Sequence, residues 1–388
     1  MKSVDYPLFK VHINNNLCLE NLEIVLNSGY INEGQQVLEL QSKLESHLEI
    51  DNLILTNSCT SAITLALKIC GVGSGDEVLT TAMTCIATNT PIINLGAHPV
   101  WVDIDTTTGS ISPTDLESKI TNKTKAIIIV DWAGTPCDLD EIARIGEKYS
   151  IKTIQDAAHA FGAKWKGKSI AKLTDFTCYS FQAIKHFTTG DGGALVCKNK
   201  SDYHLAKKLK WFGFDRDLVK DEKGNWKGQK WDADIAPNEV GYKFNMNNIS
   251  AAIGLSNLGS INEILEKHRE NAATYTENFK NSKLIKPLKV PVDAISSYWV
   301  FTVLVSEQVH KRDWILAKLN EENIGAGLVH LPNHNYSCFK ASSTVLQQTD
   351  IFSKTQISLP CGWWLGKNEI DFISETLIDL TLEAEKFV

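Results

Sequence analysis

Short apolar, mostly β-branched runs alternate with amphipathic segments between about residues 52 and 245. The runs have the length of buried strands, and the segments between them have helical periodicity. The expected strands are residues 52–56, 77–81, 98–102, 126–130, 152–156, 176–180 and 193–197. The expected helices are residues 61–70, 88–95, 112–119 and 139–149. This alternation predicts a mostly parallel sheet with helices on both faces and a ligand site at the carboxyl ends of its strands.

The pattern changes after about residue 246. We expect one long helix over residues 247–279, followed by strands near 298–305 and helices near 312–320 and 369–384. The polar, glycine-rich residues 224–231 are expected to form a loop. The sequence therefore predicts a large domain over residues 1–245 and a smaller α/β domain over residues 246–388.

Charge and cysteine content narrow the class of protein. The formal net charge is −7 and no basic block occurs, so we expect no binding of nucleic acid or of a membrane surface through charge. The nine cysteines include no CxxC pair, which favours reduced thiols, and we assign no metal ligands. No signal-peptide core and no apolar stretch of roughly 18 residues occurs, so we expect a cytoplasmic protein.

Hydroxyl side chains and a cysteine follow the first expected strand, in the segment that contains Ser58, Cys59 and Thr60. Small hydroxyl residues at such a junction commonly cap the following helix. The same geometry presents free N–H groups and the positive end of the helix dipole to a phosphate. Capping alone and phosphate binding both remain open for this segment.

Asp156 follows the apolar run at residues 151–154, where it should point into the ligand crevice. An enzyme that uses pyridoxal 5′-phosphate (PLP) needs a carboxylate against the pyridine nitrogen, because the protonated ring acts as an electron sink. The alternative is an aspartate that caps the next turn. His159, three residues on, is either a contact of the ring hydroxyl or a packed core histidine.

Lys185 lies in a run that begins with Ser180 and ends with a glycine-rich turn at Gly192 and Gly193. A lysine that forms a Schiff base needs a lowered pKa and a backbone that a flat cofactor can approach. The hydroxyl of Ser180 should face the same crevice and could hold phosphate. A phosphate-binding helix start, a buried aspartate and a lysine after a strand occur in the order that a PLP aminotransferase needs.

At this point the chain resembles the sugar-nucleotide aminotransferases of the DegT/StrS type, which are fold-type I PLP enzymes. The resemblance implies a three-layer α/β/α PLP-transferase fold with a mostly parallel central sheet and a smaller C-terminal α/β domain. Its specificity comes from the order and number of the matching stretches. They are residues 29–34, 57–62, 75–78, 156–163, 180–193, 241–246, 251–254 and 297–299.

The resemblance also implies roles for individual residues. Lys185 is the Schiff-base lysine, Asp156 is the partner of the pyridinium nitrogen, and His159 is the contact of the ring hydroxyl. The phosphate-binding segment is expected to supply Ser58, Cys59 and Thr60, together with Ser180.

Two positions depart from the family pattern around the cofactor. The family completes each site with a glycine–tyrosine segment of the partner subunit, so we expect a homodimer with shared active sites. That segment usually carries an Asn where this chain has Lys243, a cation that could still reach the phosphate. Cys85 stands where the family often places an aromatic over the cofactor ring, so we expect weaker stacking or stacking from elsewhere.

The residues expected near the substrate are less sharply defined. His330 is either a substrate contact or an exposed loop histidine, and Pro332 stands where the family often has an arginine. Arg216 would pair with a pyrophosphate or form a surface salt bridge. Trp363 and Trp364 either line the substrate pocket or pack in the core.

The function implied is transfer of an amino group from glutamate to a keto carbon, C4 or C3, of a nucleotide-linked deoxy sugar. Relatives that remove a sugar hydroxyl carry histidine in place of the Schiff-base lysine. Here the offset from Ser180 puts Lys185, not His186, at that position, which favours amino transfer. A PLP-dependent dehydratase of sugar nucleotides and a non-catalytic regulator with this fold are the alternatives.

Overall fold

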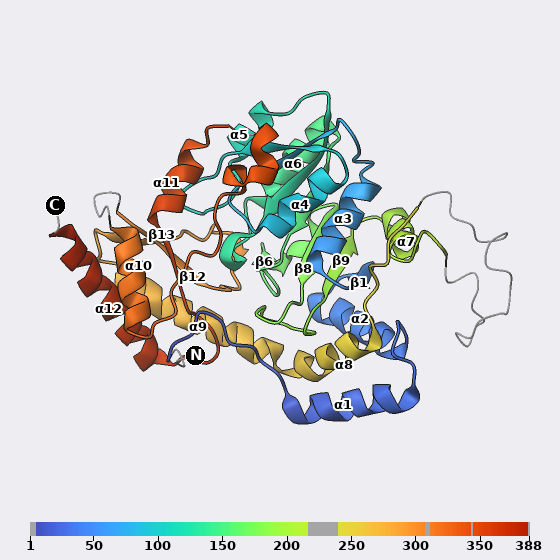
Figure 1. The fold of residues 1–388 in the computed structure, drawn as a ribbon, viewed down its shortest axis with the longest axis horizontal. Coiled ribbons are helices and arrows are strands. Elements are labelled where there is room, and N and C mark those ends of the chain that lie inside the picture. The colour runs from blue at the N-terminus through green and yellow to red at the C-terminus, as the bar shows by residue number, and fades with distance from the viewer. Residues whose placement is uncertain (1–4, 216–239, 307–310, 343, 387–388) are drawn as a thin grey trace.

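A seven-stranded sheet forms the centre of the computed structural model, which describes residues 5–215, 240–306, 311–342 and 344–386 (Figure 1). Its strand order is β1-β9-β8-β5-β4-β2-β3. The strands are β1 (Leu53–Thr56), β2 (Glu77–Thr81), β3 (His98–Val102), β4 (Thr124–Val130), β5 (Lys152–Asp156), β8 (Phe176–Ser180) and β9 (Gly193–Cys197). Only β9 runs antiparallel to its neighbours. The sheet is therefore mostly parallel, as predicted.

Helices cover both faces of this sheet because its strands are apolar on both sides. Leu53 and Leu55 of β1 belong to one core cluster, whereas Ile54 belongs to the other, as the alternation of side chains along a strand requires. The helices whose buried residues join the first cluster include α2 (Gln35–Leu48), α6 (Leu139–Tyr149) and α8 (Asn248–Asn257). The second cluster includes buried residues of α3 (Cys59–Ile69), α4 (Ile86–Asn94) and α7 (Lys200–Leu209). The three-layer α/β/α fold is confirmed.

A second sheet of three antiparallel strands lies in the C-terminal part, in the order β10-β12-β13. Its strands are β10 (Ile285–Pro287), β12 (Phe301–Val305) and β13 (Gln356–Leu359). It shares a separate core cluster with α9 (Ile261–Phe279), α10 (Arg312–Glu321) and α12 (Lys367–Glu385). The strand expected near residues 298–305 and the helices expected near 312–320 and 369–384 are present. The domain boundary at residues 245 and 246 stays a prediction.

The remaining elements are short or lie at the periphery. They are α1 (Asn15–Ser28), α5 (Pro113–Ser118), α11 (Gln347–Thr355), β6 (Lys164–Trp165), β7 (Lys168–Ser169) and β11 (Ala294–Ile295). In the part of the chain that the structure describes, no helix combines the length and the apolar character needed to cross a bilayer.

The expected single helix over residues 247–279 is wrong. The structure divides it into α8 and α9, with a 3₁₀ turn at Leu258–Ser260 between them. Asn257 uses its side-chain amide to donate to the carbonyl of Thr188 at 3.0 Å, and Gly259 weakens the helix at this point. The expected loop at residues 224–231 lies outside the described residues.

Candidate active site

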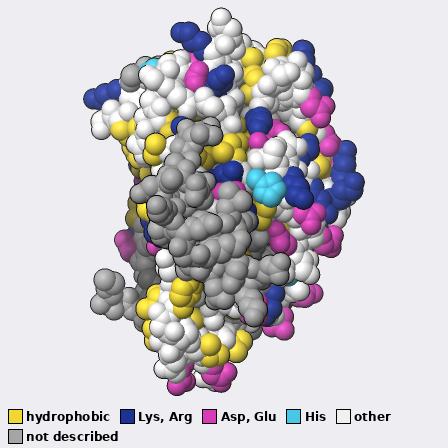
Figure 2. All heavy atoms as spheres, turned by 90° about the vertical axis from the view of Figure 1, so that its right-hand side faces the viewer, with side chains coloured by type: hydrophobic (Ala, Val, Ile, Leu, Met, Phe, Trp, Pro, Cys, Tyr) yellow, Lys and Arg dark blue, Asp and Glu magenta, His cyan; other side chains and the backbone are white. Residues whose placement is uncertain are grey.

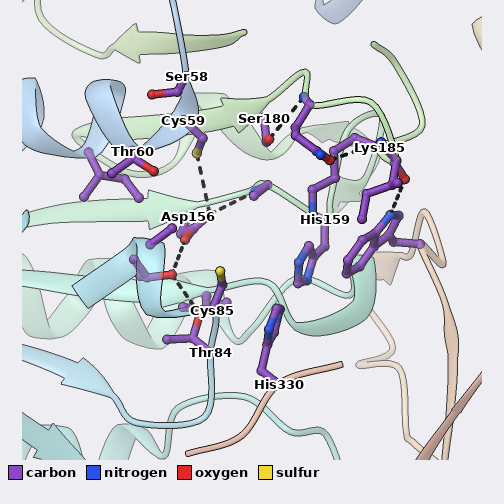
Figure 3. Close-up of a pocket in the computed structure, with 18 of the residues that line it drawn as sticks. Ser58, Cys59, Thr60, Thr84, Cys85, Asp156, His159, Ser180, Lys185 and His330 are labelled. Carbon is purple, nitrogen blue, oxygen red and sulfur yellow. Dashed lines mark hydrogen bonds between the residues drawn. The ribbon is translucent and has the colours of Figure 1, made fainter. Parts of the chain in front are cut away.

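A cavity of about 320 Å³ opens where β2, β4, β5 and β8 end (Figure 3). This is the carboxyl edge of the parallel strands, where ligands of such sheets bind. The structure brings most of the predicted site residues together around it. They are Ser58, Cys59, Thr60, Cys85, Asp156, His159, Ser180, Lys185 and His330.

One end of the cavity is formed by the start of α3, directly after β1. Ser58 caps this helix, and its Oγ accepts from the N–H of Ser61 at 3.1 Å. A Cβ at Gly193 would lie 2.5 Å from the backbone nitrogen of Cys59, so only glycine lets β9 pass this close. Capping by Ser58 is confirmed. Ser58 also lines the cavity, and phosphate binding by this segment stays a prediction. The first-turn N–H groups suit a phosphate.

Asp156 is buried at the end of β5 and is held by several donors. Its Oδ2 accepts from Thr88 Oγ1 at 2.7 Å, and its Oδ1 accepts from the N–H of Ala158 at 3.0 Å. Burial raises the pKa of Asp156, against the effect of these hydrogen bonds and of Lys185. A cationic ring nitrogen beside the carboxylate would offset the cost of burying its charge.

Lys185 follows β8 in a turn closed by its N–H, which donates to the carbonyl of Gln182 at 2.9 Å. Its amine lies 3.5 Å from the centroid of the Trp299 ring. Burial lowers the pKa of Lys185 to about 8, while the charge of Asp156 raises it. The amine is thus much easier to deprotonate than an exposed lysine, as nucleophilic attack on an aldehyde requires.

Two histidine rings line the same cavity. His159 stacks on Trp299 with centroids 3.9 Å apart, and on His330 with centroids 5.4 Å apart. Burial lowers the pKa of His159, and it lowers that of His330 to about 3. Within the described residues, His159 Nδ1 and His330 Nε2 have no hydrogen-bond partner. His159 is therefore packed yet able to contact a ligand, and His330 is not an exposed loop residue.

These residues fit PLP. The start of α3 suits its phosphate, Asp156 suits the ring nitrogen, and the unpartnered Nδ1 of His159 suits the ring hydroxyl. The amine of Lys185 is available for the aldehyde. Nothing in the described ranges groups three or more His, Cys, Asp or Glu side chains in a way that could hold a metal ion.

One of the predicted residues that the structure describes is not part of this cavity. Lys243 lies outside it, where its amine donates to Asn245 Oδ1 at 2.5 Å and lies 4.1 Å from the centroid of the Trp211 ring. A role for Lys243 in the partner's site stays a prediction. Arg216 lies outside the described residues.

The two C-terminal tryptophans pack rather than line the cavity. The Trp363 ring contacts His12 edge to face, with centroids 5.2 Å apart. Trp364 Nε1 donates to the carbonyl of Pro7 at 3.1 Å. These contacts agree with the packing interpretation, and a role in the substrate pocket stays a prediction.

Thr88 and Trp299 are among the cavity residues that sequence reasoning missed. Trp299 lies inside a stretch that carries the family resemblance and Thr88 does not, and the resemblance assigned neither residue a contact. Thr88 belongs to the first turns of α4, and Trp299 precedes β12, far from Asp156 and Lys185 in sequence. No local pattern reports on such long-range contacts.

Comparisons with known proteins give one consistent result. The family model described as the DegT/DnrJ/EryC1/StrS aminotransferase family matches residues 13–378. The UDP-4-amino-4-deoxy-L-arabinose–oxoglutarate aminotransferase of Shewanella sediminis is 34% identical over 323 residues, which are 82% of each chain.

Solved structures agree with the sequence comparisons. AtS13 from Actinomadura melliaura matches with a TM-score of 0.88 and 34% identity, covering 98% of this chain and 100% of that one. Spr1654 from Streptococcus pneumoniae, solved in a PLP form, matches with a TM-score of 0.87 and 28% identity, covering 97% and 99%. This chain therefore belongs to the DegT/DnrJ/EryC1/StrS aminotransferase family, whose members are PLP-dependent.

Proposed function

We propose that this protein transfers an amino group from glutamate to a keto carbon, C4 or C3, of a nucleotide-linked deoxy sugar. The observation that carries the proposal is one cavity in which the amine of Lys185 and the carboxylate of Asp156 meet the start of α3. The Shewanella relative supports the substrate class, because its name contains a UDP-linked amino sugar and, as a separate compound, oxoglutarate.

In this proposal PLP supplies an electron sink that stabilises negative charge at the carbon next to the transferred nitrogen. Asp156 keeps the ring nitrogen protonated. Lys185, once its amine is released, removes the proton from the substrate carbon and returns it on the other side of the C–N bond. The lowered pKa of Lys185 suits both tasks near neutral pH.

The position of His186 argues against the dehydratase alternative. A dehydratase of this family would have histidine where the Schiff-base lysine stands. Here His186 does not line the cavity, and its Nε2 donates to the carbonyl of Ser297 at 3.0 Å. The side chain that enters the cavity is the lysine.

We also propose that two chains form a homodimer with shared active sites. Exposed apolar side chains gather on α1, including Leu19, Ile24 and Leu26, which are 68%, 59% and 57% exposed. Figure 2 shows the molecule from the right-hand side of Figure 1, with hydrophobic side chains at its lower end, the level at which α1 lies in Figure 1. Their burial against a second copy would remove apolar surface from water.

The test is a panel of keto-sugar nucleotides with GDP, UDP and dTDP carriers, each incubated with PLP, glutamate and the protein. Mass spectrometry should detect an amino-sugar nucleotide and 2-oxoglutarate for at least one member. Lys185→Ala should form neither, although it should still bind pyridoxamine phosphate. A protein that PLP cannot turn yellow, or a Lys185→Ala variant with near-normal turnover, would contradict the proposal.

A further inference from the structure

The three residues Ser297–Trp299, just before β12, contact the residues on both sides of Lys185. Trp299 Nε1 donates to the carbonyl of Ile184 at 2.9 Å. His186 Nε2 donates to the carbonyl of Ser297 at 3.0 Å. The residues before and after Lys185 are therefore both tied to one short segment from the C-terminal part of the chain.

The Ser297–Trp299 segment is itself fixed by further bonds. The N–H of Trp299 donates to the carbonyl of Ala133 at 2.8 Å, and His268 Nδ1 donates to the carbonyl of Tyr298 at 2.7 Å. Tyr298 has a φ of +48°, a left-handed conformation that few residues other than glycine adopt. A strained residue persists only where its surroundings fix it, so the segment has one defined position beside Lys185.

The ring of Trp299 also faces the reactive amine. The Nζ atom of Lys185 lies 3.5 Å from its centroid, well within the range of a cation–π interaction. His159 stacks on the same indole at 3.9 Å and 20°. Lys185 and His159 both line the cavity (Figure 3), so one indole contacts the amine and the histidine expected to hold the cofactor ring.

We propose that Trp299 is a positioning residue for Lys185. Its N–H fixes the peptide that precedes the lysine, and its ring face holds the amine at the cavity wall when the amine is not bonded to cofactor. This inference rests on the proposed function, because it takes Lys185 to be the residue that condenses with PLP. In that step a C=N bond forms between the lysine nitrogen and the aldehyde carbon, and water leaves.

A simpler alternative is that Trp299 only forms a wall of the cofactor site. The two roles differ in what a substitution changes. Loss of a wall weakens the binding of every form of the cofactor. Loss of positioning slows condensation with PLP but spares the affinity for pyridoxamine phosphate, which has an amine in place of the aldehyde and cannot condense with Lys185.

The experiment mixes cofactor-free protein with PLP and follows the rate at which the Schiff-base absorbance grows. A separate titration measures the Kd of pyridoxamine phosphate. Trp299→Leu removes both contacts and should slow condensation about tenfold, and Trp299→Phe keeps an aromatic face and should slow it about threefold. Trp101→Phe, at a buried tryptophan of β3 outside the cavity, is the matched control and should leave the rate unchanged.

The Kd of pyridoxamine phosphate should stay within about threefold in all variants. An unchanged condensation rate in Trp299→Leu would overturn the inference, and so would a Kd that weakens in parallel with the rate. If Trp299→Leu does not fold, Trp299→Phe decides, because an unchanged rate without the N–H donor would also overturn it. If the unmodified protein forms no Schiff base, the proposed function is overturned as well. If the unmodified protein forms its Schiff base normally, a negative result with the variants overturns only the role of Trp299.

Discussion

Lys185 differs from an ordinary lysine because of its surroundings in the folded chain. Its amine lies beside an indole ring and near a buried carboxylate, in a cavity that partly removes it from water. Burial disfavours the charged form and lowers the pKa, while the negative charge of Asp156 works in the opposite direction. The sequence indicated a lysine after a strand, but the balance of these two effects depends on residues far away along the chain.

The pKa of Lys185 gives a prediction for the pH dependence of its reaction with PLP. Only the neutral amine attacks an aldehyde, so the condensation rate should rise about tenfold per pH unit below the pKa and level off above it. With a pKa of about 8, the plateau should begin near pH 8. Stopped-flow absorbance of cofactor-free protein mixed with PLP measures this profile.

The matched variant is Asp156→Asn. It removes the negative charge that raises the pKa of Lys185, so the plateau should begin at a lower pH than in the unmodified protein. A rate that keeps climbing to pH 10 in the unmodified protein would show that the amine behaves as an exposed lysine and would contradict this account.

At the scale of elements, the central strands were predictable and their long-range partners were not. The bounds expected for β2, β3, β5, β8 and β9 agree with the structure, because each is an apolar run bounded by polar or turn-forming residues. Asp156 and Lys185 were predictable for the same reason, since Asp156 ends one such strand and Lys185 follows another.

The break between α8 and α9 was not predictable in this way. Helical periodicity continues across residues 257–260, and the break depends on the side chain of Asn257 reaching the carbonyl of Thr188. The contact of Trp299 with the cavity could not be predicted for a related reason. Its role depends on contacts with Ile184 and Lys185 that only the folded chain creates.

The helix α9 leads to a prediction about acid stability. His268 lies on this helix, and burial lowers its pKa to about 4. The unfolded chain, with a histidine pKa near 6.5, binds a proton more readily, so the contribution of His268 to stability is present above pH 6.5 and is lost as the pH falls toward 4. Between pH 7 and pH 5 this residue should cost about 2 kcal/mol of unfolding free energy.

Urea unfolding at the two pH values tests this prediction. His268→Asn retains a donor for the carbonyl of Tyr298 and cannot titrate, so its loss of stability between pH 7 and pH 5 should be smaller by about that amount. His204→Asn, at an exposed histidine, is the control and should behave as the unmodified protein. Equal losses in His268→Asn and in the control would contradict the assignment of a buried neutral imidazole.

At the scale of the whole molecule, the proposed dimer explains two observations that a single chain does not explain. The apolar side chains of α1 are exposed. Lys243 lies outside the cavity of its own chain, although the family pattern places the residue at this position in an active site. A second copy that covers α1 and receives Lys243 in its own site would account for both. The fold itself follows from the sequence, but which surfaces meet depends on the shape of the assembled molecule.

Mixed dimers test whether the sites are shared. Lys185→Ala removes the amine, and Lys243→Glu places a negative charge where a phosphate contact is expected, so each variant alone should be inactive. When the two chains are co-expressed, mixed dimers contain one site with both lysines intact, and about a quarter of the unmodified activity should return at equal amounts. No recovery, with mixed dimers verified by two affinity tags, would place Lys243 in the site of its own chain, and an active Lys243→Glu variant would place it in none.

The central claim is that Lys185 forms the bond to PLP. Borohydride reduction of the PLP-treated protein, followed by proteolysis and mass spectrometry, identifies the residue that carries the cofactor. We predict one stoichiometric pyridoxyl label, on the peptide that contains residue 185, and no label there after treatment of Lys185→Ala. A label at another lysine, or no label in the unmodified protein, would contradict the account.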